Sequence, residues 1–198
     1  MLDRKILTDV HRYWFGDDAA NVPKEKFDLW FSAKPEFDAE IRERYEKYLE
    51  PVKATDWNLA TLSEWEQVGL VILLDQFPRN IYRSTGDAFA YDEKARAISH
   101  ELLKDGVTRF HPSERPFVML PFMHSELMAD QDRSVALYAN ELAAAPPERV
   151  EGARMAFDFA YKHWMLIRKF GRFPHRNAMM GRQSTPEEIE FLKGGRGF

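Results

Sequence analysis

The chain has 198 residues, of which 44% are apolar and 30% charged, a composition that supports one ordinary domain with a hydrophobic core. The formal net charge of -4 argues against a general nucleic-acid binder, and the absence of cysteine excludes disulfides, thiolate metal sites and cysteine nucleophiles. No apolar run reaches the ~18 residues of a membrane span, and the first residues lack the apolar core of a secretory signal. We therefore expect a cytoplasmic protein that does not enter a membrane.

Helical spacing of apolar residues predicts the first elements. A helix is expected over about residues 3–15, ended by Gly16, and a short one over 24–31. A clearer helix is expected over about 36–49, where an apolar residue recurs at every fourth position. Pro51 is expected to end this helix.

The next helix is predicted to be the first of two central helices. Thr61 and Glu64 have the spacing of a capping box, and the helix that follows, about 62–76, is apolar almost all round. We expect it to be buried and to be stopped by Pro78, because a residue before proline avoids the helical conformation.

Helices are also expected in the second half of the chain. Asp92 is the predicted N-cap of a helix over about 93–104, and another helix is expected to run to about Ala144. The longest, over about 147–170, has little polar surface and is the predicted second central helix, ended by Gly171.

The last predicted helix is short and begins at a capping box. Thr185 is its expected cap, with Pro186 at the first helical position and Glu188 at the third. No segment shows the alternation of a strand. The sequence thus predicts one all-α domain over residues 1–198 with about seven to nine helices, either a helical bundle or a short α-solenoid similar to tetratricopeptide (TPR) repeats. A regular 34-residue period is missing.

Two similar Phe-Pro segments follow the predicted central helices. Residues 73–80 read LLDQFPRN, and residues 170–177 read FGRFPHRN. Each segment places an arginine and an asparagine just past a helix end. The first also carries Asp75 in an apolar run, and a buried carboxylate must be paired. We expect Asp75 to contact an arginine of the second Phe-Pro turn.

Charge is distributed unevenly near the second turn. Residues 159–186 contain no acid, yet they include six cations and two histidines: Lys162, Arg168, Lys169, Arg172, Arg176, Arg182, His163 and His175. Such an excess of positive charge needs negative charges nearby to balance it. The internal candidates are Asp75, Glu126, Asp130 and Asp132. An anionic ligand is the other candidate, because arginine binds carboxylate and phosphate in bidentate fashion.

Other kinds of site are not indicated. Neither His-x-x-x-His nor Glu-x-x-His occurs, so no metal is expected. Ser125 lacks the Gly-x-Ser-x-Gly context of a hydrolase nucleophile, and neither a Gly-x-Gly-x-x-Gly motif nor a P-loop is present. We therefore expect no cofactor. His124, His163 and His175 remain candidates for acid–base chemistry, since histidine titrates near neutral pH.

Three hypotheses about function follow from these residues. The first is a pocket for a small anionic ligand near the two Phe-Pro turns. The second is an interaction module that holds a protein segment in a TPR-like groove. The third is a metal-independent acid–base enzyme. The residues expected to form the ligand site are Asp75, Gln76, Arg79, Asn80, His124, Glu126, Asp130, Arg133, Arg172, His175, Arg176 and Asn177.

The sequence also resembles a known family. The segments that carry the resemblance are residues 13–16 (YWFG), 73–80 (LLDQFPRN), 88–92 (AFAYD), 121–126 (PFMHSE), 130–134 (DQDRS) and 170–177 (FGRFPHRN). They are similar to the motifs of a bacterial domain-of-unknown-function family. The resemblance spans nearly the whole chain. It implies a TPR-like α-helical fold and no catalytic residue.

Overall fold

The computed structural model describes residues 3–31 and 34–195, and these residues form helices, turns and loops with no strand. The all-α prediction is therefore confirmed. The chain divides into two compact units, Met1–Val118 and Met119–Phe198. The single domain over residues 1–198 and the TPR-like arrangement stay predictions. Among the described helices, none is both long and apolar enough to cross a bilayer.

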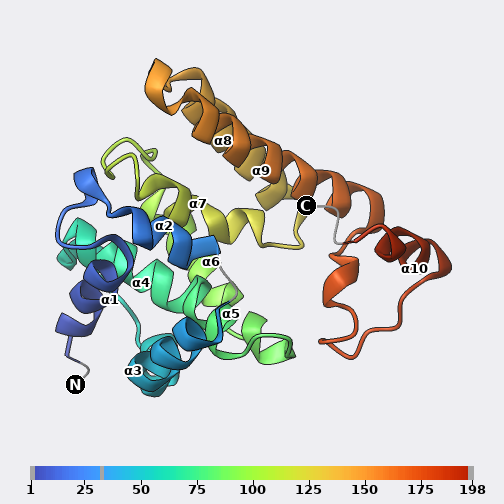
Figure 1. Ribbon diagram of the computed structural model, residues 1–198, viewed down its shortest axis with the longest axis horizontal. Helices are drawn as coiled ribbons and strands as arrows, with labels where there is room; N and C mark the ends of the chain where they lie inside the picture. The colour runs from blue at the N-terminus through green and yellow to red at the C-terminus, as the bar shows by residue number, and fades with distance from the viewer. Residues whose placement is uncertain (1–2, 32–33, 196–198) are drawn as a thin grey trace. The chain divides into compact units, whose positions relative to one another are not determined.

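Unit 1 is built around α4. Its helices, which can be followed in Figure 1, are α1 (Lys5–Phe15), α2 (Lys24–Phe31), α3 (Pro35–Ala54), α4 (Glu64–Asp75), α5 (Phe77–Ile81), α6 (Asp92–Leu102) and the start of α7 (Arg115–Met123). Every α4 residue from Gln67 to Asp75 is buried, as the apolar run predicted. Helices α1, α3 and α6 pack around it.

Close packing of α1 on α4 depends on Gly69. A Cβ at this position would overlap the backbone carbonyl oxygen of Leu7 and lie 2.9 Å from the carbonyl carbon. Backbone atoms inside a helix cannot move aside as a flexible side chain does. The missing side chain of Gly69 therefore sets how near the two helices approach.

The first Phe-Pro turn anchors the aromatic part of this core. Phe77 is fully buried, and its ring centroid lies 4.7 Å from that of Tyr45, 5.7 Å from that of Trp14 and 6.1 Å from that of Tyr13. Tilted and edge-on ring pairs at these distances stabilise a core beyond their buried area. The turn thus fastens the end of α4 to α1 and α3.

Several predicted helix ends in unit 1 were wrong. The capping box uses Ser63 and Glu66, not Thr61 and Glu64, because Thr61 belongs to the 3-10 turn Leu59–Thr61. Pro51 lies inside α3, which continues to Ala54, since a proline near a helix end removes only one hydrogen bond there.

The first central helix ends at Asp75, just before Phe77-Pro78, as predicted. A short helix that was not predicted, α5, follows directly, and Pro78 sits in its first turn, where its missing N–H has no partner to lose. Asp92 is not an N-cap, because α6 begins at Asp92 itself and the preceding Tyr91 makes no side-chain capping bond.

Unit 2 consists of the end of α7, the helices α8 (Met128–Ala143), α9 (Val150–Phe170) and α10 (Pro186–Lys193), and the turns that join them. Helices α8 and α9 lie side by side along their length (Figure 1). Gly171 ends α9 in the left-handed conformation, with φ 71°, as predicted. The predicted capping box of Thr185 and Glu188 is present at the start of α10.

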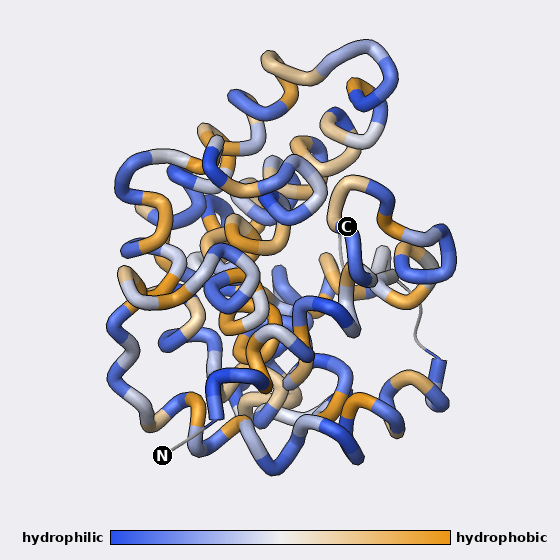
Figure 2. Tube along the Cα trace, turned by 90° about the vertical axis from the view of Figure 1, so that its left-hand side faces the viewer, coloured by the Kyte–Doolittle hydropathy of each residue, from blue (hydrophilic) through white to orange (hydrophobic). Residues whose placement is uncertain are grey.

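Helix α9 differs from its prediction as a second buried central helix. Only Ala160, His163, Leu166 and Ile167 are buried in it. Its other large apolar side chains are partly or largely exposed, because they spread around the helix instead of sharing one face. Figure 2 shows polar and apolar residues interspersed along the chain.

We predict opposite effects of alanine at two helical glycines. Gly69→Ala should lower the free energy of unfolding by about 2–3 kcal/mol, because the new Cβ forces α1 and α4 apart. A Cβ at Gly152 in α9 would meet no atom within 4 Å. Gly152→Ala should therefore raise the free energy of unfolding by about 0.5–1 kcal/mol, because alanine has the better helix propensity. Urea denaturation of the two variants and the wild type measures both effects. Equal stabilities of the two variants would contradict the close contact.

Candidate functional site

The first Phe-Pro turn pairs its charged side chains within unit 1. The Asp75 carboxylate is buried at the end of α4, where it accepts a hydrogen bond from the Gln76 amide and lies 3.8 Å from the Arg79 guanidinium. Arg79 also donates two hydrogen bonds to Asp92, at 2.9 and 3.0 Å. One guanidinium thus interacts with two carboxylates. The expected contact of Asp75 with the second turn joins different units and stays a prediction.

Asn80 and Arg83 bind a carboxylate of α3. The Asn80 amide donates to Asp38 at 2.9 Å, and Arg83 donates to the same carboxylate at 2.6 and 2.7 Å. Burial acts to raise the pKa of Asp38, but these hydrogen bonds outweigh it and the pKa is lowered. Asn80 therefore ties α5 to α3, a role that the sequence did not indicate.

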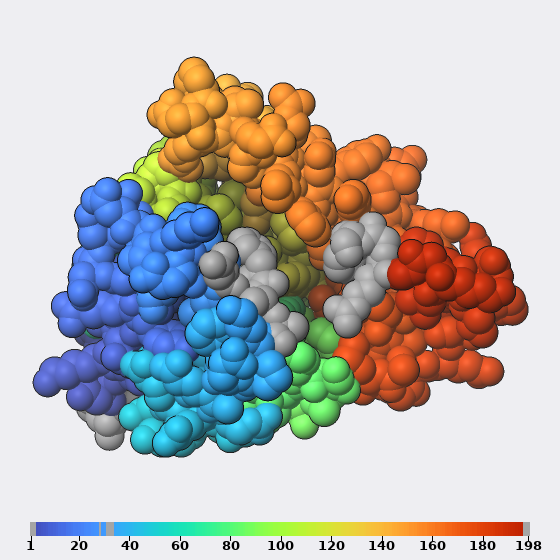
Figure 3. Space-filling model, in the orientation of Figure 1, coloured from blue at the N-terminus to red at the C-terminus, as the bar shows by residue number. Residues whose placement is uncertain are grey.

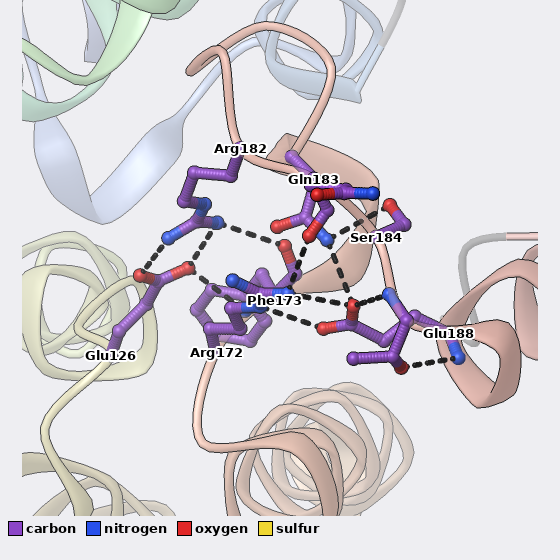
Figure 4. A network of polar contacts seen from close by, with 9 residues as sticks. Glu126, Arg172, Phe173, Arg182, Gln183, Ser184 and Glu188 are labelled. Carbon is purple, nitrogen blue, oxygen red and sulfur yellow. Dashed lines mark hydrogen bonds and ion pairs between the residues drawn. The ribbon is translucent and has the colours of Figure 1, made fainter.

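In unit 2, Glu126 clamps the second Phe-Pro turn. Its carboxylate accepts two hydrogen bonds from Arg182, at 2.6 and 2.9 Å, and one from the backbone N–H of Phe173, at 2.8 Å (Figure 4). Arg182 also donates to the Phe173 carbonyl at 3.2 Å. Burial acts to raise the pKa of Glu126, but the bonds from Arg182 and Phe173 prevail and lower it.

Glu188 is the second carboxylate of this network (Figure 4). It accepts hydrogen bonds from Arg172 at 2.7 and 2.8 Å, from the backbone N–H of Thr185 at 2.7 Å and from the Asn177 amide at 3.2 Å. The bond from Arg172 is the main reason that the pKa of Glu188 falls to about 2. Helix α10 is thereby fixed to the second Phe-Pro turn.

Two imidazoles and a guanidinium lie around Phe173, and a third imidazole lies beside one of the two. The buried Phe173 ring lies 5.4 Å from the His163 ring, 5.6 Å from the His175 ring and 4.6 Å from the guanidinium of Arg176. The His124 and His163 rings are 6.4 Å apart, and Arg176 donates to the His124 carbonyl at 2.9 Å. We call His124, His163, His175 and Arg176 the histidine cluster.

His163 is the neutral member of the histidine cluster. Burial is the main cause that lowers its pKa, to about 3, and the positive charges of His124, Arg176 and His175 add to the effect. Its Nδ1 lies 2.7 Å from the Phe159 carbonyl oxygen, which only accepts, so Nδ1 carries the proton. The lone pair is then on Nε2, and His163 offers no second donor to an anion.

The polar residues at the start of α8 hold the chain between α7 and α8. Asp130 is buried and accepts a hydrogen bond from the Ser125 hydroxyl at 2.7 Å. The Gln131 amide donates to three backbone carbonyls of residues 122–125, at 2.6, 2.8 and 3.2 Å. Arg133 lies over an aromatic ring of α7 at 4.7 Å. Asp130 and Arg133 thus make contacts that hold α8 to the chain before it.

The twelve predicted site residues therefore fall into separate groups. Asp75, Gln76, Arg79 and Asn80 lie in unit 1, and the other eight, His124, Glu126, Asp130, Arg133, Arg172, His175, Arg176 and Asn177, lie in unit 2. Sequence reasoning missed Asp38 and Glu188 as charge partners. Glu188 had a signal, because Glu187 and Glu188 are the first acids after the acid-free residues 159–186.

Another buried pair lies in unit 1. The His11 Nε2 atom is 2.5 Å from the Glu114 carboxylate, both side chains are buried, and the His11 ring stacks on Trp65 at 4.6 Å. The pair fastens α1 to the start of α7. Across the described residues, no three histidine, aspartate or glutamate side chains are grouped as a metal site.

The chain matches the model of a bacterial protein family. The family model described as "Bacterial protein of unknown function (DUF924)" matches residues 10–196, so the chain belongs to this family. This confirms the resemblance seen in the sequence. No curated protein matches the chain.

A solved structure is similar over nearly the full length. It is that of ATU0120 from Agrobacterium tumefaciens, a protein of unknown function. The TM-score is 0.80 and the sequence identity 28%, and the match covers 96% of this chain and 98% of the other.

We predict that Glu188 makes stability depend on acid pH. A lowered folded-state pKa contributes stability that is present above the ordinary pKa of 4.5 and is lost as the pH falls toward about 2. Glu188→Gln should therefore be less stable than the wild type at pH 7, and its stability should fall less between pH 5 and pH 3. Urea midpoints at these pH values measure the difference.

Glu187→Gln is the matched control. Glu187 is exposed and pairs with Lys169 at 3.0 Å, a contact that should contribute less than about 1 kcal/mol. A Glu188→Gln variant that behaves like Glu187→Gln at every pH would show that the Arg172–Glu188 pair does not hold unit 2 together.

Proposed function

We propose that this protein binds a small anionic ligand, with a phosphate or carboxylate group, at the histidine cluster of unit 2. His124, His175 and Arg176 would donate to the anion beside the Phe173 ring. The observation that carries the proposal is geometric: the His175 ring and the Arg176 guanidinium lie 5.6 and 4.6 Å from the Phe173 ring, and the His124 ring lies 6.4 Å from that of His163.

The cost of gathering like charges supports an anion as the ligand. Cationic groups in one place repel each other unless a negative charge compensates them. Glu126 and Glu188 lie nearby, but each accepts two hydrogen bonds from another arginine, Arg182 or Arg172. A bound anion would add to Glu126 as a counter-charge for Arg176, whose planar guanidinium suits carboxylate and phosphate oxygens.

The proposal is narrower than the site expected from the sequence. Arg79 is engaged by Asp92 and Arg172 by Glu188, so neither serves as a clamp. Asn177 donates to Ser184 and Glu188. His163 supplies the neutral wall of the site, and its pKa of about 3 makes it too weak a base for general base catalysis near pH 7.

Thermal shift with inorganic phosphate, pyrophosphate and a panel of mono-, di- and tricarboxylates tests the proposal. At a concentration 100 times the Kd, a ligand stabilises by about 2.7 kcal/mol, which raises Tm by roughly 5–10 °C for a chain of this length. At least one anion should give such a shift at low ionic strength. Wild-type protein that responds to none of them would overturn the proposal.

Two variants locate the binding. Arg176→Ala should abolish the anion-dependent shift, measured from its own Tm so that a loss of stability does not interfere. Arg176→Lys should weaken the shift, because lysine keeps the charge and loses the planar fork. The control is Arg168→Ala, which removes an exposed arginine of α9 that lies over Trp164. If Arg168→Ala reduces the anion-dependent shift in Tm as much as Arg176→Ala does, the anion is attracted by the overall positive charge and does not bind at the histidine cluster.

A further inference from the structure

The outward surface of α9 carries charges in a symmetric order. Glu151, Asp158, Lys162 and Lys169 are all exposed. They are separated by seven, four and seven residues, so they lie along one line of an α-helix. The order is acid, acid, lysine, lysine, and its midpoint is residue 160. We call these four residues the α9 charge line.

Apolar side chains flank the α9 charge line on both sides. Met155 and Phe159 lie on one side, with 57% and 40% of their surface exposed, and Tyr161 and Met165 lie on the other, with 46% and 47% exposed. Part of this segment is visible in orange in the space-filling view of Figure 3. Large apolar groups gathered on one surface are typical of an interaction site.

An open hollow lies beside the same line. It has a volume of about 450 Å³ and is lined by Tyr161, Trp164, Met165, Arg168 and Lys169. Aromatic residues, methionine and arginine are the side chains enriched at protein interfaces. The surface therefore combines an ordered line of charges with apolar side chains on both sides of it.

Within the part of the chain that the structure describes, the charges of the line have weak partners. Glu151 lies 4.0 Å from Arg154, and Lys169 lies 3.0 Å from Glu187, both on the surface. Lys162 extends over the Phe159 ring at 5.5 Å. Exposed ion pairs of this kind contribute little to stability. These side chains can therefore give up their present partners and pair with charges of another molecule at a small cost in free energy.

We propose that α9 docks against α9 of a second copy of this chain, antiparallel and related by a two-fold axis near residue 160. Glu151 would then lie beside Lys169 of the partner subunit, and Asp158 beside Lys162 of the partner subunit. Two-fold symmetry repeats each pair, so four ion pairs run along the middle of the contact, with apolar side chains on both sides of them. A parallel arrangement would place like charges together instead, which favours the antiparallel one.

The expected dimer is weak. A contact between one helix of each copy is small compared with the ~800 Å² per partner of a standard stable interface. Association should therefore depend on concentration and should weaken as salt screens the four ion pairs.

Sedimentation velocity from low micromolar to several hundred micromolar protein tests the proposal. The wild type should shift from monomer to dimer. Asp158→Lys should raise the Kd about tenfold or more, because a lysine then faces Lys162 of the partner subunit. The double variant Asp158→Lys with Lys162→Asp should associate like the wild type, because the exchange restores opposite charges across the axis.

Two controls make the test specific. Glu43→Lys reverses an exposed charge of α3 and should leave the Kd unchanged. Circular dichroism and Tm verify that each variant keeps its fold. A wild type that stays monomeric at every concentration would overturn the proposal, and so would equal effects of Asp158→Lys and Glu43→Lys.

Crosslinking decides the direction of the two helices. The chain has no cysteine, so single cysteines can be placed at will. In the antiparallel pair, copies of residue 162 are about 6 Å apart along the helix axis and copies of residue 151 about 27 Å apart, from the 1.5 Å rise per residue. A short bismaleimide should therefore link Lys162→Cys and not Glu151→Cys. Equal linking at both positions would mean a parallel pair and would contradict the proposal.

Discussion

Two carboxylates, Glu126 and Glu188, hold the C-terminal part of unit 2 in place. Residues 159–186 supply six cations and no acid, so their charge must be met by residues outside that stretch. Glu126 reaches Arg182 and the backbone of Phe173, and Glu188 reaches Arg172 and Asn177. Losing either carboxylate would leave an arginine of a tightly bonded region without its charge partner, which costs more than the pair itself contributes.

This division of charges also shapes the candidate site. Arg172 and Arg182 use their forks on protein carboxylates, whereas Arg176 donates to a backbone carbonyl and lies over the Phe173 ring. The imidazoles of His163 and His175 lie at the same ring, and that of His124 lies 6.4 Å from the His163 ring. Structural ion pairs and the histidine cluster thus lie side by side in unit 2. The proposed ligand site keeps three of the twelve residues expected from the sequence, His124, His175 and Arg176.

The two Phe-Pro segments have similar sequences but form different structures and make different contacts. Both bury the phenylalanine completely, because a large ring next to a proline packs well at the end of a helix. The first continues into α5 and delivers Arg79 to two carboxylates of its own unit. The second forms a 3-10 turn, Pro174–Arg176, and presents a histidine and an arginine next to one aromatic ring. The additional residue His175 accompanies this difference.

The sequence by itself determined the local features: the all-α class, the buried α4, the left-handed Gly171 and the cap at Thr185. Each depends on a periodicity or on residues within one turn, and such forces act between neighbours in the chain. It did not determine which of two overlapping capping patterns is used, or that α9 keeps an exposed face. Nor did it reveal the pairing of Arg182 with Glu126, which are 56 residues apart. Only the tertiary structure decided these points, because an ion pair or a buried face depends on which distant segments meet.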